Sequence, residues 1–166
     1  MSALNIDKKG ENMKPEEIKP NTKLCTILGY NAQTGKCRKY FNAVLKKNGV
    51  NATAIALNIK DEHLDTTLEG VAFSKVEKMI FESEFRETAV LYCDAMNKSA
   101  VNTNSVDFIE IKDEQIFGYS LNDDVAKLVK NPEYVDADME LAIKMMLLAN
   151  RWYGTKIEMD LIPTLI

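Results

Sequence analysis

A loop between a predicted strand and a predicted helix carries the residues that most resemble a phosphate-binding motif. It runs from Gly29 to Gly35 and is followed by Lys36 and Cys37. A nucleotide-binding P-loop has four residues between its glycines, then a lysine and a hydroxyl residue. Here five residues separate the glycines, and Cys37 stands where the magnesium-binding hydroxyl would be. The pattern therefore favours a plain strand-to-helix turn, whose helix N-terminus can still attract a small anion.

Spacing argues against two other kinds of site. A dinucleotide-binding fingerprint needs three closely spaced glycines between a strand and a helix, and the seven glycines of this chain are scattered. The three cysteines, Cys25, Cys37 and Cys93, form no CxxC pair, and His63 is the one histidine. We therefore expect no cofactor in this chain, no metal site, and reduced cysteines of the kind found in cytoplasmic proteins.

Composition argues against nucleic-acid and membrane partners. The 166 residues carry a formal net charge of -4, whereas nucleic-acid binding requires clustered excess Lys and Arg. The longest apolar stretch, residues 145–149, is far below the roughly twenty residues that span a bilayer. Residues 1–23 are polar and contain two prolines, which predicts a disordered N-terminal arm before a single domain over residues 24–166.

The sequence after this arm alternates predicted strands and helices. Short apolar runs predict strands at residues 24–28, 53–59 and 79–81. Apolar residues at helical spacing predict helices over residues 37–45, closed by Gly49, over residues 64–71, and over residues 85–93. Such alternation implies a largely parallel sheet with helices on both faces.

The pattern changes in the second half of the chain. Two β-rich runs, residues 106–111 and 115–119, predict a hairpin that adds antiparallel strands at one edge of the sheet. A long helix follows over residues 138–153, with Asp138 as its N-cap and Gly154 beyond its end. The predicted fold class is therefore α/β, with three layers and a mixed, mostly parallel sheet.

Several short motifs occur along the chain in one order. Residues 100–103 read Ala-Val-Asn-Thr, residues 118–122 read Gly-Tyr-Ser-Leu-Asn, and residues 152–154 read Trp-Tyr-Gly. Together with Gly29 and Asn42, these motifs resemble the substrate-binding, N-terminal domain of shikimate dehydrogenases, whose signatures include Ala-Val-Asn-Thr and Gly-x-Asn-Thr-Asp. The resemblance covers about residues 24–160. The family would insert its NADP-binding Rossmann domain where this chain has only residues 123–137 before its last predicted helix.

The resemblance assigns the family's functional positions to residues of this chain. Arg86 stands at the position of the catalytic lysine and Asn122 at that of the catalytic aspartate. Arginine is effectively never deprotonated and an amide does not titrate, so neither residue can exchange a proton with a substrate hydroxyl. Gly35 and Cys37 replace two serines, Ile80 and Glu82 replace Asn and Thr, Lys144 replaces a glutamine, and Asn102 is retained. The predicted ligand-binding set is therefore Gly35, Cys37, Glu82, Arg86, Asn102, Asn122 and Lys144.

Four of these residues also have a purely structural interpretation. Arg86 and Lys144 can be cations that extend to solvent from helices. Asn102 can be a turn residue that binds backbone groups. Cys37 falls on the apolar face of its predicted helix, where a cysteine usually acts as a small core residue.

Three functions stay open from the sequence. The first is a stand-alone shikimate dehydrogenase-like binding domain, without dehydrogenase activity, for a small polar or anionic ligand such as a hydroxylated carboxylic acid. The second is the substrate-binding subunit of a split shikimate or quinate dehydrogenase, completed by a separate Rossmann-domain chain. The third is a non-catalytic interaction protein, for example a homodimer, with a vestigial cleft.

Overall fold

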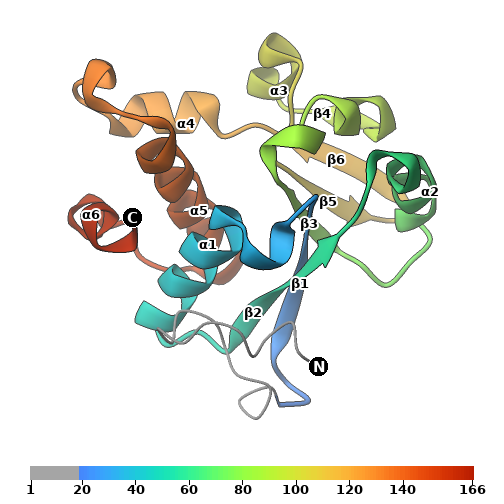
Figure 1. Ribbon diagram of the computed structural model, residues 1–166, viewed down its shortest axis with the longest axis horizontal. Helices are drawn as coiled ribbons and strands as arrows, with labels where there is room; N and C mark the ends of the chain where they lie inside the picture. Colours follow the sequence, from blue (N-terminus) through green and yellow to red (C-terminus); the bar gives the residue numbers. More distant parts are fainter. Residues whose placement is uncertain (1–18) are drawn as a thin grey trace. The chain divides into compact units, whose positions relative to one another are not determined.

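The computed structural model describes residues 19–166 (Figure 1). The predicted disordered arm falls mainly on residues 1–18, outside the described residues, and stays a prediction. Within the described part, Lys19 and Thr22 form a turn in which the Thr22 N–H donates to the Lys19 carbonyl at 3.0 Å. Lys23 then begins the first strand. No helix among these residues is long and apolar enough to cross a membrane.

In the described part of the chain, six strands form one mixed sheet in the order β2-β1-β3-β5-β6-β4. They are β1 (Lys23–Gly29), β2 (Ala52–Asn58), β3 (Lys78–Phe81), β4 (Ala95–Met96), β5 (Phe108–Lys112) and β6 (Gln115–Tyr119). β3 is parallel to β1, β5 is antiparallel to β3 and β6, and β4 is parallel to β6. This confirms the predicted mixed, mostly parallel sheet. The hairpin does not form an edge, however, because β4 pairs with β6 beyond it.

Residues 19–166 also form six α-helices and several short 3-10 helices, of which those from α4 onward follow the last strand, β6. The α-helices are α1 (Lys36–Lys47), α2 (Asp61–Val71), α3 (Lys98–Thr103), α4 (Asn122–Leu128), α5 (Ala137–Tyr153) and α6 (Ile162–Leu165). The 3-10 helices are η3 (Ala32–Thr34), η4 (Ser83–Phe85), η5 (Thr88–Tyr92), η6 (Pro132–Tyr134) and η7 (Met159–Leu161). α1 and α2 confirm the first two predicted helices, and Gly49 follows α1 with a φ of 65°.

The predicted helix over residues 85–93 is wrong. The chain there forms η4 and η5 instead of one α-helix. In an α-helix the Arg86 carbonyl would accept from the Val90 N–H. Here it accepts from Val106 N at 3.0 Å, while Val90 N donates to the Glu87 carbonyl at 3.2 Å. A tertiary hydrogen bond thus replaces the helical one at Arg86.

The last long helix begins one residue earlier than predicted. Its N-cap is Asp136, whose carboxylate accepts from Met139 N at 2.8 Å, and not Asp138. Asp138 lies in the first helical turn, where its carboxylate contacts the Lys36 ammonium at 2.7 Å. The predicted end is confirmed, because Gly154 adopts a left-handed conformation with a φ of 68°.

The predicted domain over residues 24–166 comprises two compact units. The sheet unit contains Cys25–Gly35 and Ala56–Leu121. The helical unit contains Lys36–Ile55, Asn122–Ile166 and the described residues up to Leu24.

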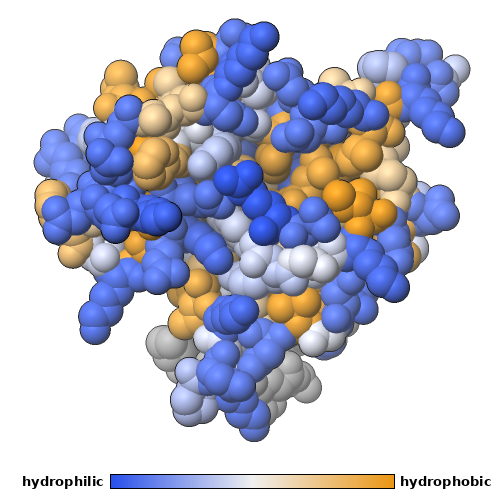
Figure 2. All heavy atoms as spheres, turned by 180° about the vertical axis from the view of Figure 1, so that it is seen from behind, coloured by the Kyte–Doolittle hydropathy of each residue, from blue (hydrophilic) through white to orange (hydrophobic). Residues whose placement is uncertain are grey.

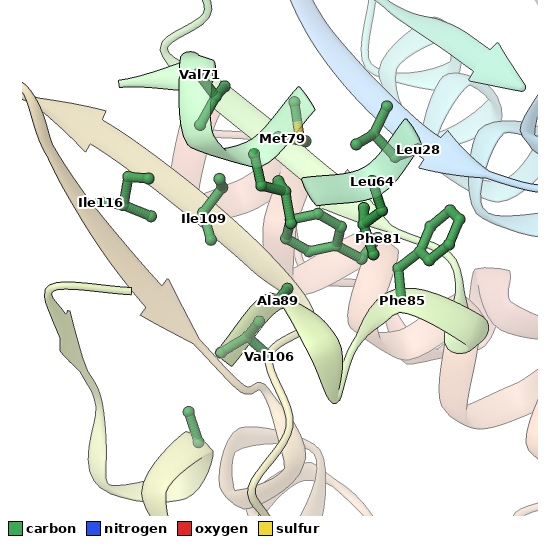
Figure 3. Packing of buried hydrophobic residues seen from close by; sticks show 12 residues of the cluster. Leu28, Leu64, Val71, Met79, Phe81, Phe85, Ala89, Val106, Ile109 and Ile116 are labelled. Carbon is green, nitrogen blue, oxygen red and sulfur yellow. The ribbon is translucent and has the colours of Figure 1, made fainter. Parts of the chain in front are cut away.

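The core of the sheet unit brings strand, α2 and 3-10 helix residues together. Phe81 at the end of β3 and Phe85 in η4 are both fully buried (Figure 3). Leu64 of α2 and Ile109 of β5 belong to the same apolar cluster. Burial of such side chains stabilises a fold by roughly 1.5 to 3 kcal/mol each, which fixes the ends of β3 and β5.

The core of the helical unit lies between α1 and α5. Phe41 of α1 packs edge-to-face against Trp152 of α5, with ring centroids 5.9 Å apart. Asn42, on the same helix, is buried and accepts a hydrogen bond from Ala54 N at 3.0 Å. This bond satisfies a backbone donor of β2 inside the unit.

Candidate functional site

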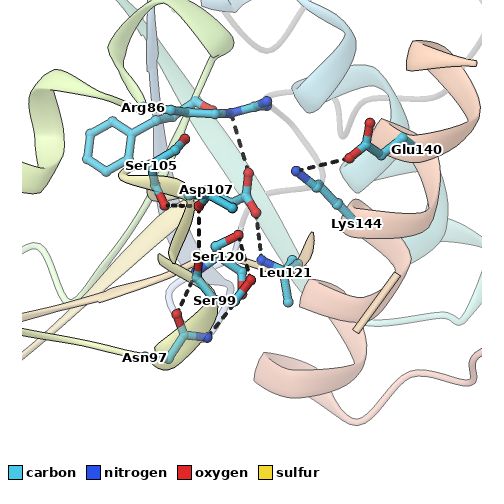
Figure 4. Close-up of polar contacts among 11 residues, drawn as sticks. Arg86, Asn97, Ser99, Ser105, Asp107, Ser120, Leu121, Glu140 and Lys144 are labelled. Atoms are coloured by element: carbon cyan, nitrogen blue, oxygen red, sulfur yellow. Dashed lines mark hydrogen bonds and ion pairs between the residues drawn. The ribbon is translucent and has the colours of Figure 1, made fainter. Parts of the chain in front are cut away.

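Arg86, which the resemblance assigns to the family's lysine position, is held at the end of β3. It immediately follows η4, and its Nε donates to the Phe81 carbonyl at 3.1 Å. The same Nε lies 3.6 Å from Oδ1 of Asp107 (Figure 4). The side chains are 18% and 4% exposed, respectively. Arg86 is therefore not a surface cation; it is a mostly buried one beside a carboxylate.

Asp107 joins three elements of the sheet unit. Its Oδ2 accepts from Leu121 N at 2.7 Å, so both carboxylate oxygens have a contact. Its backbone N–H donates to the Tyr119 carbonyl at 2.7 Å, and its carbonyl accepts from Phe81 N at 3.0 Å. Because Leu121 directly precedes Asn122, one carboxylate connects Arg86 with the chain at the second motif position. Buried carboxylates need such partners to offset their lost hydration.

A second polar group joins α3 to the end of β6. The Asn97 side chain is the N-cap of α3 and accepts from Ala100 N at 3.0 Å. It also accepts from Ser120 N and donates to the Ser120 carbonyl, both at 3.0 Å. The hydroxyls of Ser99 and Ser120, both buried, lie 3.2 Å apart. Asn102, the predicted binding residue, is instead exposed in the last turn of α3.

The glycine loop after β1 packs against a carboxylate of the same unit. A Cβ placed on Gly35 would lie 2.3 Å from Oε1 of Glu82, and one on Gly29 would lie 2.6 Å from its Cγ. The neighbouring Glu84 accepts from Tyr30 N at 2.7 Å. The structure thus brings together the two predicted residues Gly35 and Glu82. It also places a negative charge where the sequence suggested attraction for a small anion.

The remaining predicted residues belong to the helical unit. Cys37 is completely buried, which agrees with its place on the apolar face of α1. Lys144 is 6% exposed, and its ammonium lies 3.6 Å from Oε1 of Glu140, four residues earlier on α5. It is therefore a buried cation and does not extend freely to solvent. Asn122 is half-buried at the first position of α4.

No thiol or metal chemistry is indicated in residues 19–166. Burial raises the pKa of the Cys93 thiol to about 11, so it stays protonated and weakly nucleophilic near neutral pH. Among the described residues, no three His, Cys, Asp or Glu side chains form a group that could hold a metal ion. No disulfide joins the cysteines there.

Two important polar residues were missed from the sequence. Asp107 is a charged residue between the apolar Val106 and Phe108, a pattern that indicates a buried and paired carboxylate. Asn97 precedes a short helical stretch, as N-cap residues do. Both patterns involve only neighbouring residues in the sequence. They do not predict the tertiary partners, which are Arg86 for Asp107 and Ser120 for Asn97.

A curated relative matches part of this chain, whereas no protein-family model matches the chain. The relative is a shikimate dehydrogenase (NADP(+)) from Aquifex aeolicus (strain VF5), 23% identical over 103 residues. The match covers 62% of this chain and 38% of that enzyme. The chain therefore spans well under two thirds of the length of this relative.

Solved structures give the same picture of the fold. Shikimate dehydrogenase from Aquifex aeolicus has a TM-score of 0.58 at 19% identity, and the match covers 79% of this chain and 54% of that one. Shikimate 5-dehydrogenase from Listeria monocytogenes, in complex with shikimate and NAD, also has a TM-score of 0.58, at 14% identity, over 67% of this chain and 38% of that one.

A 5-ketofructose reductase of Gluconobacter sp. strain CHM43 is similar to the same degree. Its TM-score is 0.58 at 14% identity, and the match covers 78% of this chain and 51% of that one. Proteins described as shikimate dehydrogenases and as a 5-ketofructose reductase thus share this arrangement of strands and helices. At these identities the likeness establishes architecture, because unrelated functions recur on one fold. The chain resembles part of shikimate dehydrogenase in sequence and has a shikimate dehydrogenase-like α/β fold.

Proposed function

We propose that this chain is a shikimate dehydrogenase-like binding domain that takes up a small hydroxylated ligand and does not transfer hydride on its own. The observation that carries the proposal is Arg86, mostly buried and fixed beside Asp107 at the position of the family's lysine. A guanidinium in this place can donate hydrogen bonds to ligand oxygens. It cannot act as an acid or base near neutral pH, because its pKa is too high.

The second motif position supports binding without proton transfer. Asn122 stands where the family has its catalytic aspartate, and an amide offers both a donor and an acceptor but does not titrate. Proton removal from a hydroxyl that becomes a ketone requires a group that can accept the proton. Arg86 and Asn122 are therefore each suited to holding an oxygen atom of a ligand and not to exchanging a proton with it.

The proposal includes the absence of a nicotinamide site in this chain. The connection between Leu121 and α5 consists of α4, η6 and short loops, which leaves no room for a βαβ dinucleotide unit between them. The glycines of the chain are too scattered for a dinucleotide-binding loop. The expected cytoplasmic location is part of the same proposal.

A thermal-shift series with the purified chain tests ligand binding. The probes are shikimate, quinate and the uncharged cyclic polyol myo-inositol, each with wild-type protein and with the variants Arg86→Gln and Arg151→Gln. A ligand at a hundred times its Kd should stabilise the fold by about 2.7 kcal/mol. We expect at least one probe to stabilise wild type and Arg151→Gln, and none to stabilise Arg86→Gln. A flat response of wild type to every probe favours the vestigial-cleft interpretation.

A spectrophotometric assay tests the loss of hydride transfer. Shikimate or quinate is mixed with the chain and NADP or NAD, and the absorbance at 340 nm is followed. We expect no change, because the chain has neither a proton acceptor at position 122 nor a dinucleotide-binding loop. Turnover that disappears in Arg86→Gln would contradict the proposal.

The split-enzyme alternative requires an apolar docking surface for a Rossmann-domain chain. On the face in Figure 2, hydrophobic side chains occur in separate patches between polar ones. In the segment where the family inserts its cofactor domain, Tyr134 is 74% exposed, but Asp123, Lys127 and Lys130 are exposed as well. This mixed surface favours the stand-alone domain. Pull-down with the full chain and mass spectrometry of captured proteins checks it, since a captured Rossmann-fold protein would support the split enzyme.

A further inference from the structure

We propose that Asp107 determines the ligand specificity of the Arg86 position. By offsetting the guanidinium charge, Asp107 makes Arg86 bind an uncharged hydroxyl or carbonyl oxygen in preference to a carboxylate or phosphate. The inference rests on the proposed function in one respect, namely that a ligand contacts Arg86. It narrows the ligand class from polar or anionic to polyhydroxylated and uncharged at this point.

The two charges lie close together and are mostly buried. Nε of Arg86 lies 3.6 Å from Oδ1 of Asp107, and the side chains are 18% and 4% exposed. Water screens such a pair far less than it screens a surface pair, so the field of the guanidinium is largely cancelled by the carboxylate. A ligand anion near Arg86 would meet a neutral pair and the repulsion of Asp107.

The chain around Arg86 carries more negative than positive charge. Between residues 79 and 93, Arg86 is the one cation, whereas Glu82, Glu84 and Glu87 carry negative charge. The Glu82 carboxylate lies against Gly35, and Glu84 accepts from Tyr30 N at 2.7 Å. This part of the sheet unit is therefore net negative. A second carboxylate or phosphate would add like charge, whereas a hydroxyl would not.

Asp107 has a structural role as well as a charge, and a substitution can separate the two. The Asp107 carboxylate also accepts from Leu121 N at 2.7 Å. In Asp107→Asn the side-chain carbonyl can still accept this hydrogen bond, while the negative charge is removed. The variant therefore changes the charge at Arg86 and keeps the acceptor on which the backbone at Leu121 depends.

The experiment follows the three arginine Nε–H resonances of the full chain by NMR. The arginines are Arg38, Arg86 and Arg151, and Arg86→Lys assigns the signal of interest. Inorganic phosphate and myo-inositol are titrated into wild type, Asp107→Asn and Asp107→Glu. In wild type we expect phosphate to leave the Arg86 resonance in place, and in Asp107→Asn we expect phosphate to shift it with at least tenfold tighter apparent binding. Asp107→Glu keeps the charge and should behave as wild type.

The outcomes separate this inference from the proposed function. If phosphate shifts the Arg86 resonance of Asp107→Asn but myo-inositol never shifts that of wild type, the charge offset is supported and binding of a polyol is not. Phosphate binding at Arg86 of wild type that is as tight as in Asp107→Asn overturns the inference. Should Asp107→Asn fail to fold, the wild-type titration still decides, because a millimolar phosphate Kd at Arg86 contradicts a neutral pair.

Discussion

The sheet unit and the helical unit each contain a cation beside a carboxylate, and the two pairs differ in burial. In the helical unit, Lys36 and Asp138 are 2.7 Å apart, with side chains 59% and 37% exposed. In the sheet unit, Arg86 and Asp107 are 3.6 Å apart, but their side chains are only 18% and 4% exposed. The shorter pair is the one that water and salt screen more strongly.

This difference shows that distance alone does not rank ion pairs. An exposed pair gains little Coulomb energy and restricts two mobile side chains. A buried carboxylate that loses a partner leaves an uncompensated charge or donor in a poorly hydrated place. The sheet unit therefore depends on a few specific polar contacts, whereas the helical unit should tolerate loss of its surface pair.

Asp107→Ala should have the largest effect on stability. The substitution leaves the Arg86 guanidinium and the buried Leu121 N–H without the Asp107 carboxylate, and we expect a loss of about 3 kcal/mol in the free energy of unfolding. Urea denaturation measures it. Asp107→Asn keeps an acceptor for Leu121 N, so its free energy of unfolding should fall by less than that of Asp107→Ala. If Asp107→Ala is no worse than Asp138→Ala, the distinction between the two units fails.

Gly118→Ala should have the next largest effect. A Cβ at Gly118 in β6 would lie 2.5 Å from the Cys93 Sγ and 2.8 Å from the Val106 Cγ1. Overpacking of this kind costs roughly 1 to 3 kcal/mol. Gly154 in the helical unit has open space around it, so Gly154→Ala should cost only the backbone strain of its positive φ, about 1 kcal/mol. Chemical denaturation of both variants tests whether packing in the sheet unit is the tighter constraint.

Within the helical unit, the helix cap should matter more than the ion pair. Asp136→Ala removes the acceptor for Met139 N at the start of α5, and we expect a loss of about 1 kcal/mol. Asp138→Ala removes only the contact with the exposed Lys36, and its free energy of unfolding should fall by less than that of Asp136→Ala. Thermal denaturation at low salt and at 1 M salt distinguishes the two, because high salt should abolish the Asp138 effect and preserve the Asp136 effect. A salt-insensitive loss in Asp138→Ala would contradict the exposed-pair interpretation.

The smallest effect is expected at high pH in the sheet unit. The hydroxyl of Tyr92 donates to the Asp65 carboxylate, and this bond raises the pKa of Tyr92 from 10.0 to about 12. Because the folded pKa is the higher one, the contribution to stability is complete below pH 10 and is lost as the pH rises toward 12. Tyr92→Phe should lack this part of the pH dependence. Parallel pH-stability curves for the two proteins would contradict it.

Much of the fold could be predicted because the periodic parts of the chain are also the buried parts. The helical spacing of residues 37–45 and the apolar run at 79–81 predict α1 and β3, which the structure confirms. The two-residue strand β4 is too short to carry a periodic signal. The apolar residues between positions 85 and 93 do have helical spacing. The predicted helix nevertheless does not form, because the Arg86 carbonyl accepts its hydrogen bond from Val106 N.

The candidate site could be predicted only in part. The motif series assigned positions to Arg86 and Glu82, and the structure adds the partners of both. Glu82 meets Gly35, and Arg86 meets Asp107, which comes from the start of β5. Asn102 matched the motif most clearly, yet the contacts to β6 are made by Asn97. A motif identifies a position in the chain, but it does not identify the neighbouring side chains that determine the net charge around that position.

The sequence alone determined the alternation of strands and helices up to β3 and the mixed sheet, because these depend on residue type and local spacing. The tertiary structure alone decided that a carboxylate 21 positions later in the chain, Asp107, lies beside Arg86. The reason is that antiparallel pairing of β3 with β5 brings residues distant in sequence to one end of the sheet. The charge around Arg86 depends on this contact between residues distant in the sequence, and hydrophobic periodicity does not predict such contacts.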